Sequence, residues 1–389
     1  MPIHFTPSTS TISDLTLHLQ MVKPAASGPE QMEIRSTFFP AEWFPQSGVQ
    51  LTWPHAGTDW APILSEVDDC YIRIALEILL RNEILLIVTP EPDRIKGLFH
   101  ERIPSRLLSH VRYFECPTND TWARDHGFLT LMTESGPRLL DFQFNGWGGK
   151  FPAELDNEIN QQIVNCQSSD CKLHGFYESH LDFVFEGGSI ESDGRGTLMT
   201  TSACLLSPNR NPDLNRLQIE ERLLRYFHAE RVLWLDHGYL AGDDTDSHID
   251  TLARFCPGGT IAYVQCTDPA DEHYEALRAM EAQLKEIAPN SQLIPLPLPS
   301  PIYDPDDGHC LPATYANFLV LNGAVLLPTY GQPEYDELAR CQLQKAFPRY
   351  DIIPIDCRVL IRQHGSLHCS TMQFPVGVLS TPNEKNSQL

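Results

Sequence analysis

The sequence predicts an α/β protein built from five repeats, each made of two strands, a helix and a third strand. From residue 128 onward, apolar runs and turn signals recur in this order about every 55 to 70 residues. Asn322-Gly323 stands between two apolar runs, which is the strongest short-range signal of a β-hairpin. The fifth repeat needs both ends of the chain, so a closed ring is favoured. An open α/β sheet with ordinary variation in spacing is the alternative.

The first two repeats follow one order of elements. For the first we expect strands at 128–132, 139–144 and 172–176, with a helix at 156–166. For the second we expect strands at 183–185, 198–201 and 232–235, with a helix at 217–227. Glycine and proline favour turns, so turns are predicted at Gly136-Pro137 and Ser192-Asp-Gly194.

The remaining repeats carry the clearest helices. The third has strands at 249–255, 261–266 and 292–296, with a helix at 272–287. The fourth has strands at 318–321, 324–327 and 352–355, with a helix at 334–347. The fifth combines residues 366–374 with a strand at 49–53, a helix at 63–81 and a strand at 84–88. If the five close around an axis, their opening strands face one another.

Composition narrows the class of protein. With 389 residues, 42% of them hydrophobic, the chain can bury a substantial core. We expect one domain at residues 36–389, after a poorly ordered extension at residues 1–35. A net charge of -23 opposes nucleic-acid binding and makes a small cationic molecule a suitable partner. No apolar run approaches the roughly 20 residues of a membrane-spanning helix, so no membrane association is expected.

The cysteines indicate a reducing compartment. Eleven is an odd count, and no C-x-x-C pair occurs, which argues against a disulfide framework and a structural zinc site. The first 35 residues lack the basic and then apolar pattern of a signal peptide. We therefore expect a cytoplasmic protein that needs neither a metal nor another cofactor. The sequence leaves the oligomeric state open, with a homodimer as one option.

Cys369 stands out from the other cysteines by its neighbours. Most cysteines in apolar strands are small buried hydrophobic residues. His364, Gly365 and His368 precede this one and Ser370 follows it, which is an unusually polar setting for a core strand. We therefore interpret Cys369 as a nucleophile.

The other candidates stand at equivalent places in the repeats. His248 and Asp250 open the third repeat, and on an extended segment residues two apart point to the same side. The alternative for this segment is an acidic loop with a capping residue. Three more candidates are Asp125, just before the first strand of its repeat, Glu186, just after the opening strand of the next, and Asn317, which opens the fourth. In a closed ring, all of them would meet at one central pocket.

Two of these candidates also have ordinary structural interpretations. Glu186-Gly187-Gly188 could be a simple turn after a strand, and the segment with Trp122 and Asp125 could be a surface salt bridge beside a packed tryptophan. Taken together, however, a cysteine, a histidine and several carboxylates are what is needed to attack the carbon of a cationic guanidinium. The sequence thus favours a cysteine-dependent guanidine deiminase.

Seven short segments between residues 38 and 375 match one known pattern in the same order. They are Trp53-Pro-His55, Asn119-Asp-Thr-Trp-Ala-Arg-Asp125, Phe144-Asn-Gly-Trp-Gly-Gly149, Glu186-Gly-Gly-Ser-Ile-Glu191, Asn209-Arg-Asn-Pro212, Asp246-Ser-His-Ile-Asp250 and Gly365-Ser-Leu-His-Cys369. Together they resemble the agmatine deiminase family, in the guanidine-modifying superfamily that also holds arginine deiminases and bacterial peptidylarginine deiminases. The resemblance implies the pentein fold, a five-bladed pseudosymmetric α/β propeller of ββαβ units.

The resemblance also implies roles. Cys369 would be the nucleophile, His248 the general acid and base and Glu186 its orienter, while Asp125 and Asp250 would clamp the guanidinium. Trp122 and Asn317 are further expected to contact the substrate. One departure is Gln363-His-Gly-Ser366, where many relatives carry Gly-Gly-Gly-Asn.

The expected activity is hydrolysis of agmatine to N-carbamoylputrescine and ammonia, through a covalent thiouronium on cysteine, in putrescine and polyamine biosynthesis. This is a hydrolase acting on C–N bonds in linear amidines. The nearest alternative is a peptidylarginine deiminase or another guanidine deiminase. Asp246-Ser-His248-Ile-Asp250 also fits the D-x-H-x-D pattern of binuclear manganese ureohydrolases, but this chain lacks their Gly-Gly-Asp-His segment. A polyamine-binding protein without turnover is the remaining option.

Overall fold

A computed structural model describes residues 36–166 and 172–380. The expected extension at residues 1–35 lies outside the described residues. The strand expected at 172–176 begins only at Phe176 and continues to Val184. The described residues belong to one compact unit that begins at Ser36. The mixed α/β class predicted from the sequence is confirmed. Among these residues, no helix is both long and apolar enough to cross a membrane.

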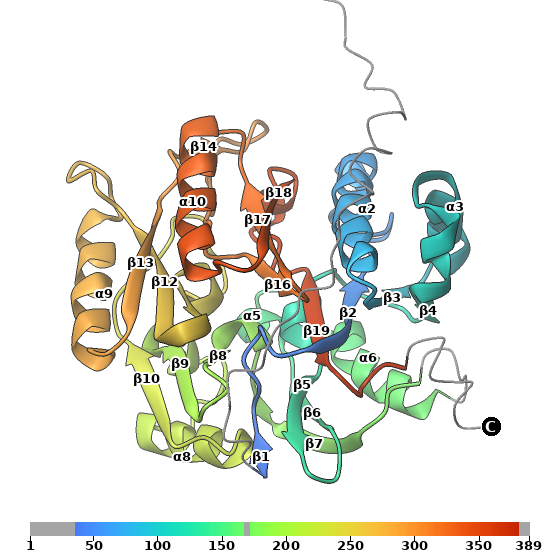
Figure 1. Ribbon diagram of the computed structural model, residues 1–389, viewed down its shortest axis with the longest axis horizontal. Coiled ribbons are helices and arrows are strands. Elements are labelled where there is room, and N and C mark those ends of the chain that lie inside the picture. The colour runs from blue at the N-terminus through green and yellow to red at the C-terminus, as the bar shows by residue number, and fades with distance from the viewer. Residues whose placement is uncertain (1–35, 167–171, 381–389) are drawn as a thin grey trace, which may run out of the picture. The chain divides into compact units, whose positions relative to one another are not determined.

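Five sheets of the described chain share one plan, in which the first strand runs antiparallel to the second and the second runs parallel to the third. Figure 1 shows these sheets with their helices. In chain order of the sheets, the strands are β5 (Leu129–Thr133), β6 (Arg138–Gln143) and β7 (Phe176–Val184); β8 (Glu191–Ser192), β9 (Thr197–Thr201) and β10 (Arg231–Leu235); β11 (Ala253–Cys256), β12 (Thr260–Gln265) and β13 (Gln292–Pro297); β16 (Leu319–Leu321), β17 (Ala324–Thr329) and β18 (Asp351–Asp356); and β19 (Thr371–Pro375), β2 (Gln46–Thr52) and β3 (Ile84–Thr89).

A helix joins the second and third strands of each sheet, as a parallel connection requires. These helices are α6 (Glu154–Asn165), α8 (Arg216–Tyr226), α9 (Tyr274–Ile287), α10 (Pro333–Ala346) and α2 (Leu64–Leu80). In the last sheet, β19 pairs with β2 although more than 300 residues separate them in the sequence. The last strand of the described chain, β19, is thereby hydrogen-bonded to β2, which lies near its beginning.

Some elements were not predicted from the sequence. The strand β1 (Thr37–Phe38) joins β5, and β4 (Val111–Glu115) follows α3 (Pro92–Arg102) and extends the sheet of β3. A separate pair consists of β14 (Ile302–Tyr303) and β15 (Cys310–Leu311). The short helices are α4 (Ala123–His126), α5 (Gly146–Gly149) and α7 (Ser202–Leu205), with the 3₁₀ turns η2 (Ala61–Ile63), η3 (Ser105–His110), η4 (Gly187–Ser189), η5 (Ile249–Thr251), η6 (Pro257–Gly259) and η7 (Leu360–Gln363).

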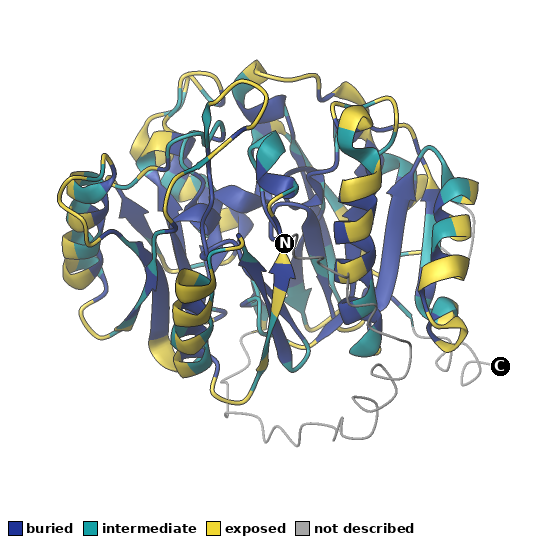
Figure 2. Ribbon diagram, turned by 90° about the horizontal axis from the view of Figure 1, so that it is seen from above, coloured by how far each residue is buried: buried dark blue, intermediate teal, exposed yellow. Residues whose placement is uncertain are grey.

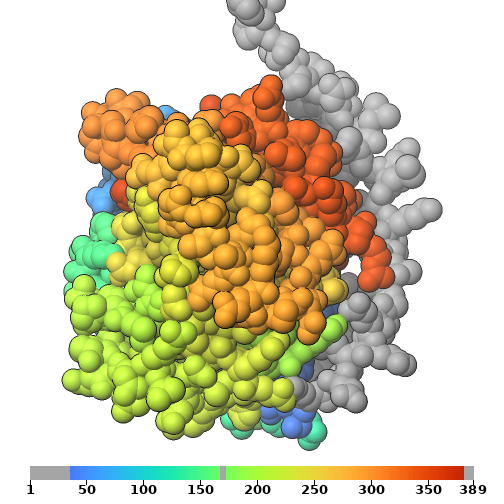
Figure 3. All heavy atoms as spheres, turned by 90° about the vertical axis from the view of Figure 1, so that its left-hand side faces the viewer, coloured from blue at the N-terminus to red at the C-terminus, as the bar shows by residue number. Residues whose placement is uncertain are grey.

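Apolar burial explains why the helices lie on the sheets. All residues of β2 and β3 are buried, and α9 buries Leu277, Met280 and Leu284 along one face. Figure 2 shows the same division, with dark blue strands inside and yellow outer faces on the helices. Figure 3 shows the surface formed by the segment of α9, in orange, above that of α8, in yellow-green.

The structure corrects three local predictions. Residues 183–185 are not the opening strand of the second sheet, because β7 extends to Val184 and the opening strand is the two-residue β8. The hairpin at Asn322-Gly323 forms, but only Gly323 has a positive φ, so its turn is not type I′. Asn322 instead exchanges side-chain hydrogen bonds with the backbone of Gln46, at 3.1 Å and 2.9 Å. Contacts with another sheet have therefore decided the conformation of this turn.

The third correction concerns the segment with His248 and Asp250. The sequence argument placed both residues on an extended strand with their side chains on one side. That premise is wrong, because residues 249–251 form the 3₁₀ turn η5 and β11 begins only at Ala253. The two side chains therefore reach different partners.

Candidate active site

Cys369 lies in a turn between η7 and β19 and is 5% exposed. The side chain of Asn317 forms two hydrogen bonds with this turn. Its amide N–H donates to Sγ of Cys369 at 3.2 Å, and Oδ1 accepts from the backbone N–H of His368 at 2.9 Å. The thiol lies 3.8 Å from Oδ2 of Asp250. Burial, together with the negative charges of Asp250 and Asp125, raises the pKa of Cys369 well above its usual value.

Gly365 allows the ring of Trp122 to lie close to this turn. A Cβ on Gly365 would lie 2.3 Å from the ring of Trp122, so only glycine fits there. The preceding His364 has a φ of 65°, in the left-handed region. Trp122 itself donates from Nε1 to Asp120 at 3.1 Å and packs against Trp60. Trp122 thus packs against the turn that carries Cys369, and its expected contact with substrate stays a prediction.

Asp125 lies in α4, and both of its oxygens are hydrogen-bonded. Oδ1 accepts from the backbone N–H of Gly188 at 2.9 Å, and Oδ2 accepts from Nε1 of Trp147 at 2.9 Å. Burial raises the pKa of this carboxyl, and His248 opposes the rise. Gly188 is required by space, since an added Cβ would lie 2.5 Å from Nδ1 of His248 and 2.9 Å from Oδ1 of Asp125.

His248 is fully buried between carboxylates. Its Nδ1 lies 3.7 Å from Oδ1 of Asp125, and its Nε2 lies 3.9 Å from Oε2 of Glu186. Neither ring nitrogen makes a hydrogen bond of ordinary geometry. Burial disfavours the charged ring, but the surrounding groups, Asp125 foremost, raise the pKa of His248 well above its usual value. A raised pKa favours the protonated imidazole, which suits a group that is to give up a proton.

Glu186 is held as an anion. Nε of Arg210 lies 3.0 Å and 2.9 Å from its two oxygens, while Nη1 donates to Asp246 at 2.6 Å and Nη2 donates to the carbonyl of Thr245 at 2.9 Å. Burial alone would raise the pKa of Glu186, but the charge of Arg210 lowers it. An ionised carboxylate therefore lies permanently behind His248.

Asp250 presents one occupied and one free oxygen. Oδ2 accepts from Nδ1 of His368 at 2.7 Å, whereas Oδ1 is buried without a partner. Burial opposes ionisation, but the hydrogen bond from His368 lowers the pKa of Asp250. An unpaired buried carboxylate oxygen is costly, and a cationic ligand would compensate for it.

The structure thus places the predicted residues in one region. Asp250 and Asn317 contact the thiol of Cys369 directly, and His248 connects Asp125 with Glu186. Sequence reasoning assigned no role to four further residues. Trp147 bonds to Asp125, Arg210 bonds to Glu186 and His368 bonds to Asp250, while Glu42 bonds to His368. Three of the four, Trp147, Arg210 and His368, stand in the sequence segments that match the family pattern. No other feature of the sequence indicated them.

Two groups of side chains in the described part could hold a metal ion by distance. One contains Glu186, Cys204 and His248, and the other contains Glu42, Glu191 and His368. In both groups an arginine already bonds to the glutamates: Arg210 in the first and Arg254 in the second. The negative charge that would attract a cation is therefore compensated from within the chain.

Comparisons with known proteins converge on one family. A sequence model described as "Porphyromonas-type peptidyl-arginine deiminase" matches residues 38–375. A protein of Vibrio parahaemolyticus, provisionally named an agmatine deiminase, is 36% identical over 87% of this chain and 96% of its own length. A cysteine-to-serine variant of C. jejuni agmatine deiminase with substrate bound is 37% identical, with a TM-score of 0.80 over 88% of this chain and 97% of that one. A structure from Porphyromonas gingivalis, provisionally named an arginine deiminase, is 48% identical, with a TM-score of 0.81 over 88% of this chain and all of that one.

Proposed function

The chain belongs to the agmatine deiminase family, which the Porphyromonas-type peptidyl-arginine deiminase model describes, and from this membership we propose that it hydrolyses agmatine to N-carbamoylputrescine and ammonia. It is a hydrolase acting on C–N bonds in linear amidines. The observation that carries the proposal is the buried thiol of Cys369 near Oδ2 of Asp250, a carboxylate whose other oxygen, Oδ1, has no partner.

In this proposal two carboxylates hold the guanidinium. Asp250 offers Oδ1, and Asp125 keeps further lone pairs on oxygens that already accept from Gly188 and Trp147. Fork-shaped N–H groups and carboxylates form strong charge-assisted hydrogen bonds. The charges also place the planar cation over Sγ of Cys369, which orients it for attack.

The chemical steps then use groups already in place. The thiolate of Cys369 adds to the central carbon of the guanidinium, and His248 gives its proton to one amino nitrogen, which leaves as ammonia. The product of this step is a thiouronium bonded to Sγ. His248, now neutral, takes a proton from water as that water attacks the same carbon. The carbon–sulfur bond then breaks as the hydroxyl proton of the intermediate passes to solvent, which frees the neutral ureido product and leaves Cys369 as a thiolate.

The raised pKa of Cys369 is consistent with ionisation upon substrate binding. In the empty site Asp250 and Asp125 oppose a thiolate, as does burial. A guanidinium between the two carboxylates brings a positive charge that offsets them. We propose that the cation therefore lowers the pKa of the thiol that attacks it.

Agmatine is favoured over larger guanidines by enclosure. A thiol that is only 5% exposed is reached more easily by a small linear cation than by an arginine held in a protein backbone. Gln363-His-Gly-Ser366 stands where many relatives have glycines and could change the part of the pocket that meets the tail of the substrate. The name of the P. gingivalis relative makes free arginine the first competing substrate to examine.

Further parts of the proposal concern the whole molecule. The five sheets of one plan support a closed five-fold arrangement in a single catalytic domain at residues 36–389. We also propose a cytoplasmic location, which fits the reduced cysteines, and a step of putrescine biosynthesis. A homodimer remains a prediction.

An ammonia-release assay with agmatine, free arginine and an arginine peptide tests the function. Wild type should release ammonia fastest from agmatine, and Cys369→Ala should release none. Cys369→Ser is a closer match in size and controls for loss of packing. Release of urea instead of ammonia, or activity that survives both substitutions, would contradict the proposal.

A further inference from the structure

A second buried histidine lies next to the nucleophile and is held from both sides. Nδ1 of His368 lies 2.7 Å from Oδ2 of Asp250, and Nε2 lies 2.9 Å from Oε2 of Glu42. The two carboxylates come from η5 and from the segment before β2. An ionised carboxylate only accepts hydrogen bonds, so Nδ1 donates to Asp250, whereas Nε2 faces both Oε2 of Glu42 and, at 3.0 Å, Nη2 of Arg254. His368 thus connects the proposed guanidinium clamp with a carboxylate outside the site.

Glu42 is itself fixed by several donors. Oε2 pairs with Arg254, and Oε1 accepts from the backbone N–H of Val320 at 2.8 Å and from the side chain of Gln373. Although burial opposes the charge, Arg254 and His368 lower the pKa of Glu42 far below its usual value. The ionised form of this carboxylate is therefore favoured, and hydrogen bonds or ion pairs to Arg254, Val320, Gln373 and His368 hold it in place.

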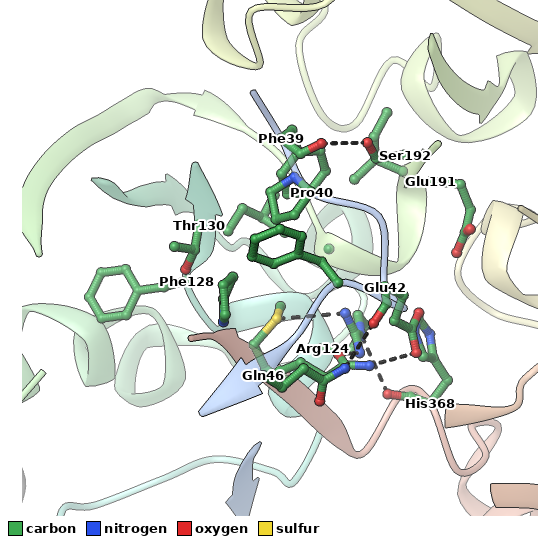
Figure 4. A pocket seen from close by; sticks show the side chains of 17 residues that line it. Phe39, Pro40, Glu42, Gln46, Arg124, Phe128, Thr130, Glu191, Ser192 and His368 are labelled. Atoms are coloured by element: carbon green, nitrogen blue, oxygen red, sulfur yellow. Dashed lines mark hydrogen bonds and ion pairs between the residues drawn. The ribbon is translucent and has the colours of Figure 1, made fainter. Parts of the chain in front are cut away.

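The same network borders a cavity that excludes the proposed catalytic groups. Figure 4 shows Glu42, Arg124 and His368 at its wall, with Glu191 on the same side as Glu42 and His368. Residues Glu42, Arg124, Glu191 and His368 line this cavity, but Cys369 and His248 do not. Glu42 thus acts from behind the turn that carries the nucleophile rather than from the substrate side.

We propose that Glu42 and His368 form a positioning pair that fixes Oδ2 of Asp250, so that Oδ1 stays directed at the guanidinium. This inference rests on the proposed function, because it assigns a use to the free oxygen. Without the hydrogen bond from His368, Oδ2 would be left with only the distant thiol of Cys369, at 3.8 Å. The carboxylate could then rotate and present a different edge to the substrate.

Two isosteric substitutions separate the two hydrogen bonds of His368. Asparagine places its amide N–H where Nδ1 stands, so His368→Asn retains a donor for Asp250 and loses Glu42. Glutamine reaches the position of Nε2, so His368→Gln retains the bond to Glu42 and loses Asp250. We expect kcat/KM for agmatine to fall about tenfold in His368→Asn and about 100-fold in His368→Gln, because small misplacements at a reacting centre carry losses of that size.

The order of these two variants distinguishes positioning from packing. Glutamine is closer in size to histidine, so a purely structural role predicts that His368→Gln is the milder change. Equal losses, or a smaller loss in His368→Gln, would overturn the inference. If wild type released no ammonia from any guanidine, the proposed function would fail instead.

Glu42→Gln provides a second test that does not depend on the folding of the His368 variants. Its matched control is Glu191→Gln, which removes a buried carboxylate from the same Arg254 but has no hydrogen bond to His368. Both should lower the melting temperature, whereas only Glu42→Gln should lower kcat/KM, by about tenfold. In a protein that already carries His368→Asn, Glu42→Gln should not lower kcat/KM further, because the hydrogen bond between residue 368 and Glu42 is already lost. Equal kinetic losses in Glu42→Gln and Glu191→Gln would contradict the positioning role.

Discussion

The two histidines at the centre of the molecule are almost equally buried, yet their nitrogens have opposite surroundings. His248 is fully buried, and neither of its nitrogens makes a hydrogen bond of ordinary geometry. His368 is 1% exposed, and both of its nitrogens face carboxylates within 2.9 Å. The first ring can pass a proton without breaking a hydrogen bond, whereas the second is fixed. Burial alone therefore does not distinguish a reactive histidine from a positioning one, but its partners do.

Replacement of His248 should have the largest effect on activity. His248→Gln removes the proposed acid and base, so we expect kcat for agmatine to fall by roughly 10³-fold. The melting temperature should fall, because the buried carboxylates of Asp125 and Glu186 lose the imidazole that lies between them. Ammonia release and thermal unfolding measure the two quantities on one preparation. A variant that retains a tenth of wild-type activity would show that the unbonded ring is not the proton carrier.

Gly188→Ala should displace His248 while leaving His368 untouched. The added Cβ would lie 2.5 Å from Nδ1 of His248, so the ring must move, and we expect about a 100-fold loss of kcat. Gly97→Ala in α3 is the control, because its Cβ would meet nothing within 4 Å. That change should leave kcat unaltered and stabilise the fold by about 1 kcal/mol, the difference in helix propensity. Full activity in Gly188→Ala would mean that the exact place of His248 is unimportant.

Ionisation of Cys369 should depend on whether a cation lies between Asp125 and Asp250. Because the pKa of the thiol is raised, little thiolate exists at neutral pH, and its fraction should increase about tenfold per pH unit below that pKa. The ultraviolet absorbance of the thiolate, taken as the difference from Cys369→Ser, measures this fraction. An alkylguanidinium without a good leaving group should move the profile to lower pH. A profile that stays in place would refute ionisation assisted by the cation.

The smallest effect is expected far from both histidines, at the start of α8. Asn215 accepts from the backbone N–H of Gln218, whose side chain bonds back in a capping box. Asn215→Ala should lower the free energy of unfolding by about 1 kcal/mol and leave kcat/KM unchanged. Denaturant unfolding gives the first value. A change in activity here would show that loss of stability alone perturbs the site, which would weaken the comparison of the two histidines.

Sequence patterns located most helices because amphipathic periodicity is local. The helices expected at 272–287 and 334–347 correspond to α9 and α10 within two residues. The prediction was wrong at 183–185 and at His248-Ile-Asp250, where contacts between sheets impose a strand end and a 3₁₀ turn. No window of neighbouring residues contains that information.

The site was predictable in its residues but not in its partners. Ordered segments indicated Cys369, His248 and the carboxylates, whose roles remain proposals. That Arg210 bonds to Glu186, or Glu42 to His368, could not be read from the sequence, since 24 and 326 positions separate them. Such pairings depend on which strands lie side by side.

The pairing of β19 with β2 has a consequence for biosynthesis. The turn that carries Cys369 is anchored by the strand Thr371–Pro375, whose partner Gln46–Thr52 is synthesised more than 300 residues earlier. A nascent chain therefore cannot complete its reactive centre before both strands have been made. Activity should appear only once these two distant segments have paired.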